Sequence, residues 1–170
     1  MKRLSRAAAI LAILAVPALA RPDEAYAPAD GRFAVKFPGA PKESTQTAKS
    51  PLGDLKVFTA TYATADGNVF MVSYTDFPEG TKPETASALY DGARDALKGK
   101  DGKLLAEKDV EVGRDKLPGR DIEVEKGKQR LRFRVVLRDG RLYQVAAVGT
   151  STFTAGKDAT RFIESFVLTK

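Results

Sequence analysis

The feature that most constrains the fold is a surplus of strand-like segments over helix-like ones. After residue 30 the chain carries short runs in which apolar and polar residues alternate, with glycine-containing turn signals between them. Only 81–97 and 155–166 have apolar residues at helical spacing. Parallel strands need long crossovers, which two helices cannot supply for so many strands. We therefore expect an α+β fold with a twisted, mostly antiparallel sheet of about six or seven strands and the helices packed on it.

The expected strands cover 33–37, 55–62, 68–74, 103–112, 117–125, 128–138 and 141–149, with a short extended tail at 167–168. Asp66-Gly67 lies between two apolar runs and predicts a tight hairpin, because the favoured two-residue turn needs positive φ at both central positions. Lys126-Gly127 and Asp139-Gly140 predict the turns of two later hairpins. Thr81 and Glu84 form a capping box, which indicates where the first helix begins.

The first twenty residues have the pattern of a cleavable secretory signal. A basic start is followed by an uncharged apolar run over 7–16, and Ala18-Leu19-Ala20 offers the small residues that signal peptidase accepts. The apolar run of about ten residues is half of the roughly twenty that a membrane-spanning helix needs. We expect a signal peptide at 1–20, a flexible leader at 21–30 and one domain at 31–170, in a periplasmic or secreted protein.

The expected signal also accounts for much of the positive charge. The chain holds 28 basic and 22 acidic residues, and three of the basic ones, Lys2, Arg3 and Arg6, precede the expected cleavage site. The remainder has a net charge of only +3, so we expect no nucleic-acid partner. No cysteine follows the cleavage site, so we expect no lipid or other membrane anchor in the mature form.

The absence of two residue types narrows the classes of function that this chain can have. The chain contains no histidine and no cysteine, which excludes Ser-His-Asp and Cys-His catalysis and the usual zinc, copper and haem sites. It carries no P-loop and no dinucleotide-binding fingerprint. We predict that the protein binds no cofactor and no metal ion, and we identify no catalytic residue. A hydrolase that uses paired carboxylates is one alternative, since acidic residues are abundant, and a carrier of a small apolar ligand is another.

A row of basic residues alternates with apolar ones along one expected strand. Its members are Lys128, Arg130, Arg132, Arg134 and Arg138. With a turn at Lys126-Gly127, residues 125, 123 and 121 lie opposite 128, 130 and 132. Asp121, Glu123 and Glu125 are acidic, so we predict three acid–base pairs on an exposed face of the sheet. This interpretation leaves Arg134, Arg138 and Arg141 without an acidic neighbour, and they form a candidate basic surface for a partner.

Three segments carry a family resemblance: Gly-Arg-Phe-Ala-Val-Lys-Phe-Pro-Gly-Ala-Pro at 31–41, Arg-Leu-Tyr-Gln-Val at 141–145 and Phe-Ile-Glu-Ser-Phe at 162–166. Together they resemble small exported bacterial proteins of uncharacterised function, which are similar in layout to the PsbP superfamily, named for an extrinsic lumenal subunit of photosystem II. The resemblance covers nearly all of 31–170. It implies a central antiparallel sheet flanked by helices on both faces, a PsbP-like α/β/α sandwich, and a scaffold or binding role rather than a shared reaction.

This chain departs from the photosynthetic members because it has no tryptophan and no histidine, so no functional residue is transferred from them. Our leading hypothesis is an exported, non-catalytic domain that binds an envelope protein or another envelope component.

Overall fold

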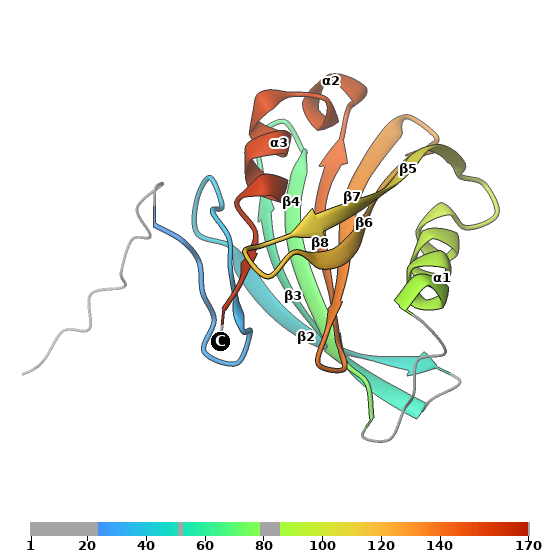
Figure 1. The fold of residues 1–170 in the computed structure, drawn as a ribbon. Helices are drawn as coiled ribbons and strands as arrows, with labels where there is room; N and C mark the ends of the chain where they lie inside the picture. Colours follow the sequence, from blue (N-terminus) through green and yellow to red (C-terminus); the bar gives the residue numbers. More distant parts are fainter. Residues whose placement is uncertain (1–23, 51–52, 79–85, 170) are drawn as a thin grey trace, which may run out of the picture.

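The computed structural model describes residues 24–50, 53–78 and 86–169. The expected signal peptide at 1–20, the first residues of the leader and the capping box of Thr81 and Glu84 lie outside these ranges, so these features stay predictions. Within the described ranges the chain forms nine strands and three helices (Figure 1).

Seven strands form one large antiparallel sheet in the order β2-β3-β4-β8-β7-β6-β5 within the described residues. Their bounds are Lys42–Ser50 (β2), Gly53–Ala63 (β3), Val69–Asp76 (β4), Lys103–Val112 (β5), Leu117–Lys126 (β6), Gln129–Arg138 (β7) and Arg141–Gly149 (β8). A small sheet joins β1 (Phe33–Ala34) to β9 (Val167–Leu168). The predicted α+β class and mostly antiparallel sheet are confirmed, as is the extended segment at 167–168.

Helices cover both faces of the large sheet, which makes the predicted α/β/α arrangement (Figure 1). Helix α1 (Ala86–Lys98) packs on one face of β6 and β7. Its buried Tyr90 is fixed by two hydrogen bonds, since the hydroxyl donates to the Pro118 carbonyl at 2.7 Å and accepts from the Leu137 amide at 3.0 Å. The other face is covered by α2 (Ser151–Thr154), α3 (Lys157–Glu164) and the small sheet.

Aromatic rings fill the space between the large sheet and the elements on this second face. We call six nearly fully buried rings the aromatic layer: Phe33, Phe37, Phe70, Tyr143, Phe162 and Phe166. Phe162 of α3 lies with its ring centroid 4.9 Å from both Phe37 and Phe70. Phe166 lies 5.6 Å from Phe33 and 5.8 Å from Tyr143. The layer therefore joins the two ends of the chain to the middle of the sheet.

The folded part of the chain begins before Gly31. Tyr26 forms an antiparallel bridge with Val35, with hydrogen bonds of 2.8 and 3.0 Å between their backbones. Its ring is half-buried and lies 5.6 Å from that of Phe37. Residues 24–30 were expected to be flexible because their sequence has no alternation, yet the ring contact and the backbone pairing of Tyr26 help to hold the segment on the core.

Strand β2 was not predicted from the sequence. It pairs with β3 at the edge of the sheet, and its side chains from Lys42 to Lys49 are exposed on both faces. A strand that buries neither face has no reason to alternate apolar and polar residues, so the periodicity that indicated the other strands is missing here.

One predicted turn and one predicted helix differ in detail from the structure. The hairpin at Asp66-Gly67 is confirmed, but the last β3–β4 pair is Ala63 with Val69, so its loop covers 64–68 rather than two residues. This loop is closed by hydrogen bonds from the Thr64 amide to the Asn68 carbonyl and from the Gly67 amide to the Thr64 carbonyl. The predicted helix at 155–166 is shorter, because Gly156 separates α3 from α2.

The aromatic layer makes a prediction about stability. Replacing Phe166, which is 2% exposed, by alanine removes a ring from a packed core and should lower the free energy of unfolding by about 3–5 kcal/mol. The measurement is urea denaturation followed by circular dichroism. The neighbouring Val167 is 43% exposed, so Val167→Ala should change the free energy by no more than about 0.5 kcal/mol. A Phe166→Ala variant as stable as Val167→Ala would contradict the role given to the layer.

Candidate functional site

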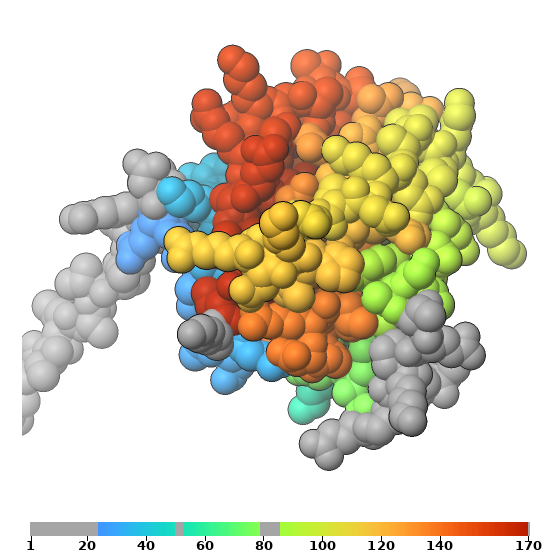
Figure 2. All heavy atoms as spheres, viewed as in Figure 1, coloured from blue at the N-terminus to red at the C-terminus, as the bar shows by residue number. Residues whose placement is uncertain are grey.

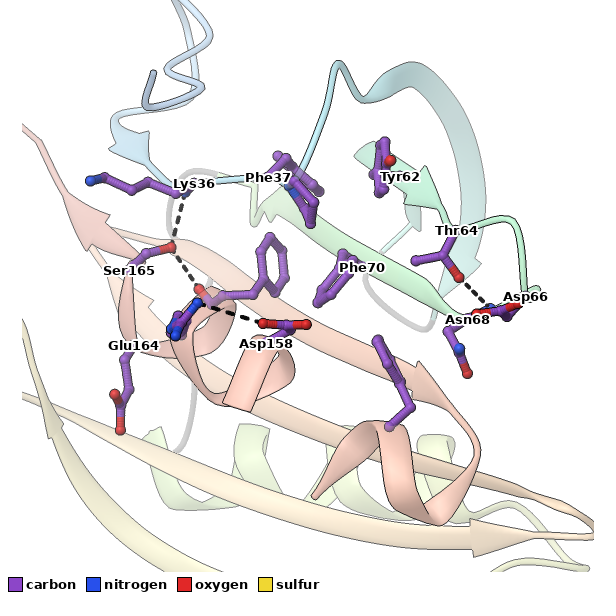
Figure 3. Close-up of a pocket in the computed structure, with 14 residues that line it drawn as sticks. Lys36, Phe37, Tyr62, Thr64, Asp66, Asn68, Phe70, Asp158, Glu164 and Ser165 are labelled. Carbon is purple, nitrogen blue, oxygen red and sulfur yellow. Dashed lines mark hydrogen bonds and ion pairs between the residues drawn. The ribbon is translucent and has the colours of Figure 1, made fainter. Parts of the chain in front are cut away.

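A groove of about 870 Å³ lies where α3 faces the loop between β3 and β4. Its lining comes from four parts of the chain: Lys36 to Pro38 after β1, Tyr62 to Phe70 around the β3–β4 loop, Phe153 of α2, and Asp158 to Ser165 in and after α3. Figure 3 shows these side chains around the groove. In the space-filling view the C-terminal segment (red) lies beside the N-terminal segment (blue) on this side of the molecule (Figure 2). The groove is therefore built from segments distant in the sequence.

The floor of the groove is aromatic. Phe37, Phe70 and Phe162 of the aromatic layer lie beneath it and are at most 3% exposed. Tyr62 and Phe153 are half-buried, so part of each ring remains accessible in the groove. The Phe153 ring packs edge-on against Phe70 at 5.1 Å. A ligand would thus meet exposed ring surface backed by a rigid core.

Hydrogen bonds hold the β3–β4 loop against the start of α2. The Oδ1 atom of Asn68 accepts from the Thr150 amide at 3.2 Å, and the Asn68 amide donates to Oγ1 of Thr64 at 3.1 Å. Oγ1 of Thr150 in turn accepts from the Phe153 amide and caps the helix. Gly149 leaves room for this contact, because a Cβ atom there would overlap Oδ1 of Asn68 and displace it. The hydrogen bonds of Asn68 and Thr150 therefore hold the start of α2, and Phe153 with it, beside the β3–β4 loop.

The rim of the groove is polar and carries both signs of charge. Lys36, Asp66, Asp158, Arg161 and Glu164 are all exposed. Asp158 and Arg161 lie one helical turn apart and form an ion pair of 3.7 Å. At one end the Ser165 hydroxyl accepts from the Lys36 amide at 2.9 Å and donates to the Phe162 carbonyl at 2.7 Å (Figure 3).

The register of β6 and β7 differs from the prediction by two residues. Lys126 lies opposite Gln129, so the turn is Gly127-Lys128, with Gly127 at a φ of +61°. A shift of two keeps every side chain on its predicted face, so the acid–base pairing survives with other partners. Asp121 lies opposite Arg134, Glu123 opposite Arg132 and Glu125 opposite Arg130.

The three residues of the candidate basic surface all have acidic neighbours, so the reason for selecting them was wrong. Arg134 forms a two-point ion pair with Asp121, at 2.7 and 3.0 Å, and both side chains are mostly buried. Arg138 lies 3.4 Å from Asp139 and 3.9 Å from Asp115. Their face of the sheet is not open as expected, because α2 and α3 pack across it. A partner at these arginines stays a prediction.

Arg141, the first residue of β8, has a structural role, because it holds the N-terminal segment in place. Its guanidinium forms two hydrogen bonds to Asp76, at 2.6 and 2.7 Å, and lies 4.1 Å from the centre of the Tyr74 ring. It also donates to the backbone carbonyls of Asp30 and Gly31. With its side chain only 8% exposed, Arg141 fastens the start of the folded chain to β4 and β8.

Three carboxylates that are distant in the sequence surround the guanidinium of Arg120. Arg120 on β6 lies 2.6 Å from Asp91 of α1, 2.9 Å from Glu107 of β5 and 3.1 Å from Asp109 of β5. Arg94 of α1 is a second cation for Asp91 and Glu107. These acids therefore tie α1 to the sheet. In the part of the chain that the structure describes, no group of three acidic side chains is arranged to hold a metal ion.

The layered sheet with helices on both faces defines an α/β/α sandwich. Comparison with solved structures shows which known fold it has. The cyanobacterial PsbP (CyanoP) from Synechocystis sp. PCC 6803 superposes with a TM-score of 0.58 at 14% sequence identity, over 85% of this chain and 91% of that one. The chain thus has the PsbP-like fold that the resemblance predicted. At this identity the likeness concerns the fold alone.

Other comparisons add little. A protein of unknown function from Pseudomonas aeruginosa is 13% identical, with a TM-score of 0.42 over 65% of this chain and 85% of that chain. No family model matches the sequence, and no curated protein matches it. Among the described helices, none is both long and apolar enough to cross a membrane.

The Arg141–Asp76 pair leads to a prediction about how the stability of the protein depends on pH. Hydrogen bonds from Arg141 hold the pKa of Asp76 below its ordinary value, although partial burial acts in the opposite direction. A carboxylate whose pKa is lowered by folding stabilises the protein above its unfolded pKa, near 4, and loses this effect as the pH falls through the folded pKa. Asp76→Asn should therefore destabilise the protein at pH 7, and its deficit against the wild type should shrink below about pH 4.

Urea midpoints measured from pH 7 down to pH 3 test this expectation. Asp54→Asn, at an exposed position of β3, is the matched control and should follow the wild type throughout. A deficit of Asp76→Asn that stays constant over the whole range would contradict the assigned role of the Asp76 charge.

Proposed function

We propose that this protein is an exported, non-catalytic binding domain that holds an apolar segment of an envelope protein in the groove between α3 and the β3–β4 loop. The observation that carries the proposal is the groove itself, in which accessible parts of Tyr62 and Phe153 lie above a buried aromatic floor. Its volume of about 870 Å³ falls within the range of about 300–1,000 Å³ that is typical of ligand sites.

The lining favours a polypeptide over a small apolar ligand. A carrier of a small apolar molecule needs an enclosed apolar chamber, whereas exposed charged side chains border this groove. A rim with Lys36 and Arg161 beside Asp66, Asp158 and Glu164 suits the mixed polar groups of a peptide. One leucine- or phenylalanine-sized anchor buried on the rings contributes about 1.5–3 kcal/mol, so several contacts are needed for stable binding.

The observed acid clusters do not favour the hydrolase alternative. Asp91, Glu107 and Asp109 surround the guanidinium of Arg120 rather than the groove. Asp158, on the rim of the groove, is paired with Arg161. The carboxylates around Arg120 attach α1 and β5 to β6, and the proposal assigns none of these acids a catalytic role.

The groove can be tested with a phage-displayed library of random linear peptides as the probe. Peptides enriched on the purified protein should share an apolar anchor residue, and Tyr62→Ala or Phe153→Ala should weaken their binding by about tenfold or more, the effect of losing about 1.4 kcal/mol. Calorimetry or fluorescence anisotropy with synthetic peptides gives the affinities.

Leu104 provides the control, because it is a large apolar residue that is 36% exposed on β5, away from the groove. Leu104→Ala should bind the selected peptides as the wild type does. Enriched peptides that bind equally well to the Tyr62→Ala and Phe153→Ala variants, or repeated selections without a common anchor, would argue against the groove as the binding site.

Export is the second part of the proposal, and the sequence of residues 1–20 supports it. Expressed as the full chain in a bacterial host, the protein should be recovered from the periplasm with Arg21 as its first residue, as read by mass spectrometry of the intact protein. Ala20→Phe places a large residue at the cleavage site and should leave the precursor uncut. Cytoplasmic protein that retains the apolar run of the signal would refute this part.

A further inference from the structure

The two edges of the large sheet differ in how they are protected. Strand β5 has a register irregularity between Leu104 and Ala106, and charged residues occupy its middle at 107–109. Glu107 and Asp109 are also bound to Arg120 of the neighbouring strand. Bulges and central charges are the devices with which sheet edges avoid pairing with another chain. Strand β5 is therefore protected against pairing with a strand of another chain.

Strand β2 lacks these devices. Its nine residues pair with β3 in an uninterrupted register from Lys42 to Ser50. Its central residues at 44–48 are uncharged, and charges occur only toward its ends, at Lys42, Glu43 and Lys49. In the described part of the chain, no backbone hydrogen bond joins β2 to a segment other than β3. The outer side of this strand lies at the margin of the molecule (Figure 1), where a further strand can be added.

We propose that β2 pairs with β2 of a second copy of this chain, in an antiparallel two-fold dimer centred on Gln46. Along β2 every second residue points its backbone N–H and C=O groups away from β3, and only these groups can bond to a further strand. In an antiparallel pair of two copies, such residues must lie opposite one another. The numbers of two paired residues therefore add to an even total. The two-fold axis then passes through a residue, and only a few registers remain.

Charge selects among these registers. With the axis at Gln46, all nine residues of β2 are paired, and Glu43 of each copy lies opposite Lys49 of the partner subunit. Moving the axis to residue 45 sets Glu43 opposite Thr47 and carries Lys49 beyond the strand. Moving it to residue 47 sets Lys49 opposite Thr45 and carries Glu43 beyond the strand. The strand is thus complementary in charge to itself in one register, which identifies a second copy as the occupant.

The two charges are also placed on the correct side. Glu43 and Lys49 are six residues apart, so both side chains project from the same face of β2. The Oε1 atom of Glu43 accepts a hydrogen bond of 2.5 Å from the Tyr26 hydroxyl, which orients the carboxylate and leaves Oε2 for Lys49 of the partner subunit. This dimer does not depend on the groove, which lies between α3 and the β3–β4 loop.

Charge exchange tests the register, with sedimentation velocity over a range of protein concentrations as the readout. Glu43→Lys and Lys49→Glu each place like charges opposite one another, and each should weaken dimerisation at least tenfold. The Glu43→Lys/Lys49→Glu double variant restores opposite charges and should return the dimer. The double variant still lacks the Tyr26–Glu43 hydrogen bond, so repair of that contact cannot explain the recovery.

Cross-linking tests the axis independently. The chain has no cysteine, and residues at the axis of an antiparallel pair have Cα atoms about 4.5–5.5 Å apart, within the range of a disulfide. Gln46→Cys should therefore form a disulfide-linked dimer on mild oxidation. In the matched control Ser44→Cys, the two cysteines are separated by about 13 Å along the strands and should stay monomeric on a denaturing gel.

Three results would overturn the dimer: a wild-type protein that remains monomeric at every concentration, a double variant that does not recover, or a Ser44→Cys variant that cross-links as well as Gln46→Cys. Peptide binding to the groove is measured separately, so failure of the dimer and failure of the proposed function are distinguishable.

Discussion

Ring-on-ring packing between the large sheet and the segments that cover it is the contact on which the rest of the structure depends. Phe33 alone lies within about 6 Å of four other rings, those of Tyr26, Tyr74, Tyr143 and Phe166. Such pairs add about 0.5–1.5 kcal/mol each beyond the area that they bury. Because these rings come from the start, the middle and the end of the chain, their packing places α3 and the small sheet on β4 and β8. The same layer is the floor of the groove, so the candidate site shares its rigidity with the core.

Arginine–carboxylate pairs act at the margins of this layer. Arg141 with Asp76 secures the N-terminal segment, Arg134 with Asp121 links β7 to β6, and Arg120 ties α1 to β5 and β6. The three arginine side chains are at most 14% exposed, and a mostly buried charge that loses its partner is costly. We therefore interpret these pairs as devices that select one arrangement of the segments. They also explain why few arginines in the described part of the chain remain for a partner.

Patterns on single strands were sufficient to predict the class of fold. Strands β6, β7 and β8 bury at least one face, and alternation made them visible in the sequence. The exposed strand β2 and the anchoring role of Tyr26 have no periodic signal and were missed. The register of β6 and β7 was misplaced by two because Gly127 can occupy either position of a two-residue turn. The groove joins rings at 37, 62, 70, 153 and 162, and no local pattern brings positions so far apart together.

The pairing of β1 with β9 has a consequence for the order of folding. Phe33 lies opposite Leu168, so the first strand of the core finds its only sheet partner within the described residues at the far end of the chain. The loop closed by this contact spans residues 33–168, and contacts of such long range are formed slowly. The aromatic layer is complete only when Phe162 and Phe166 reach Phe37 and Phe33. Both ends of this loop must therefore be present before the core can close.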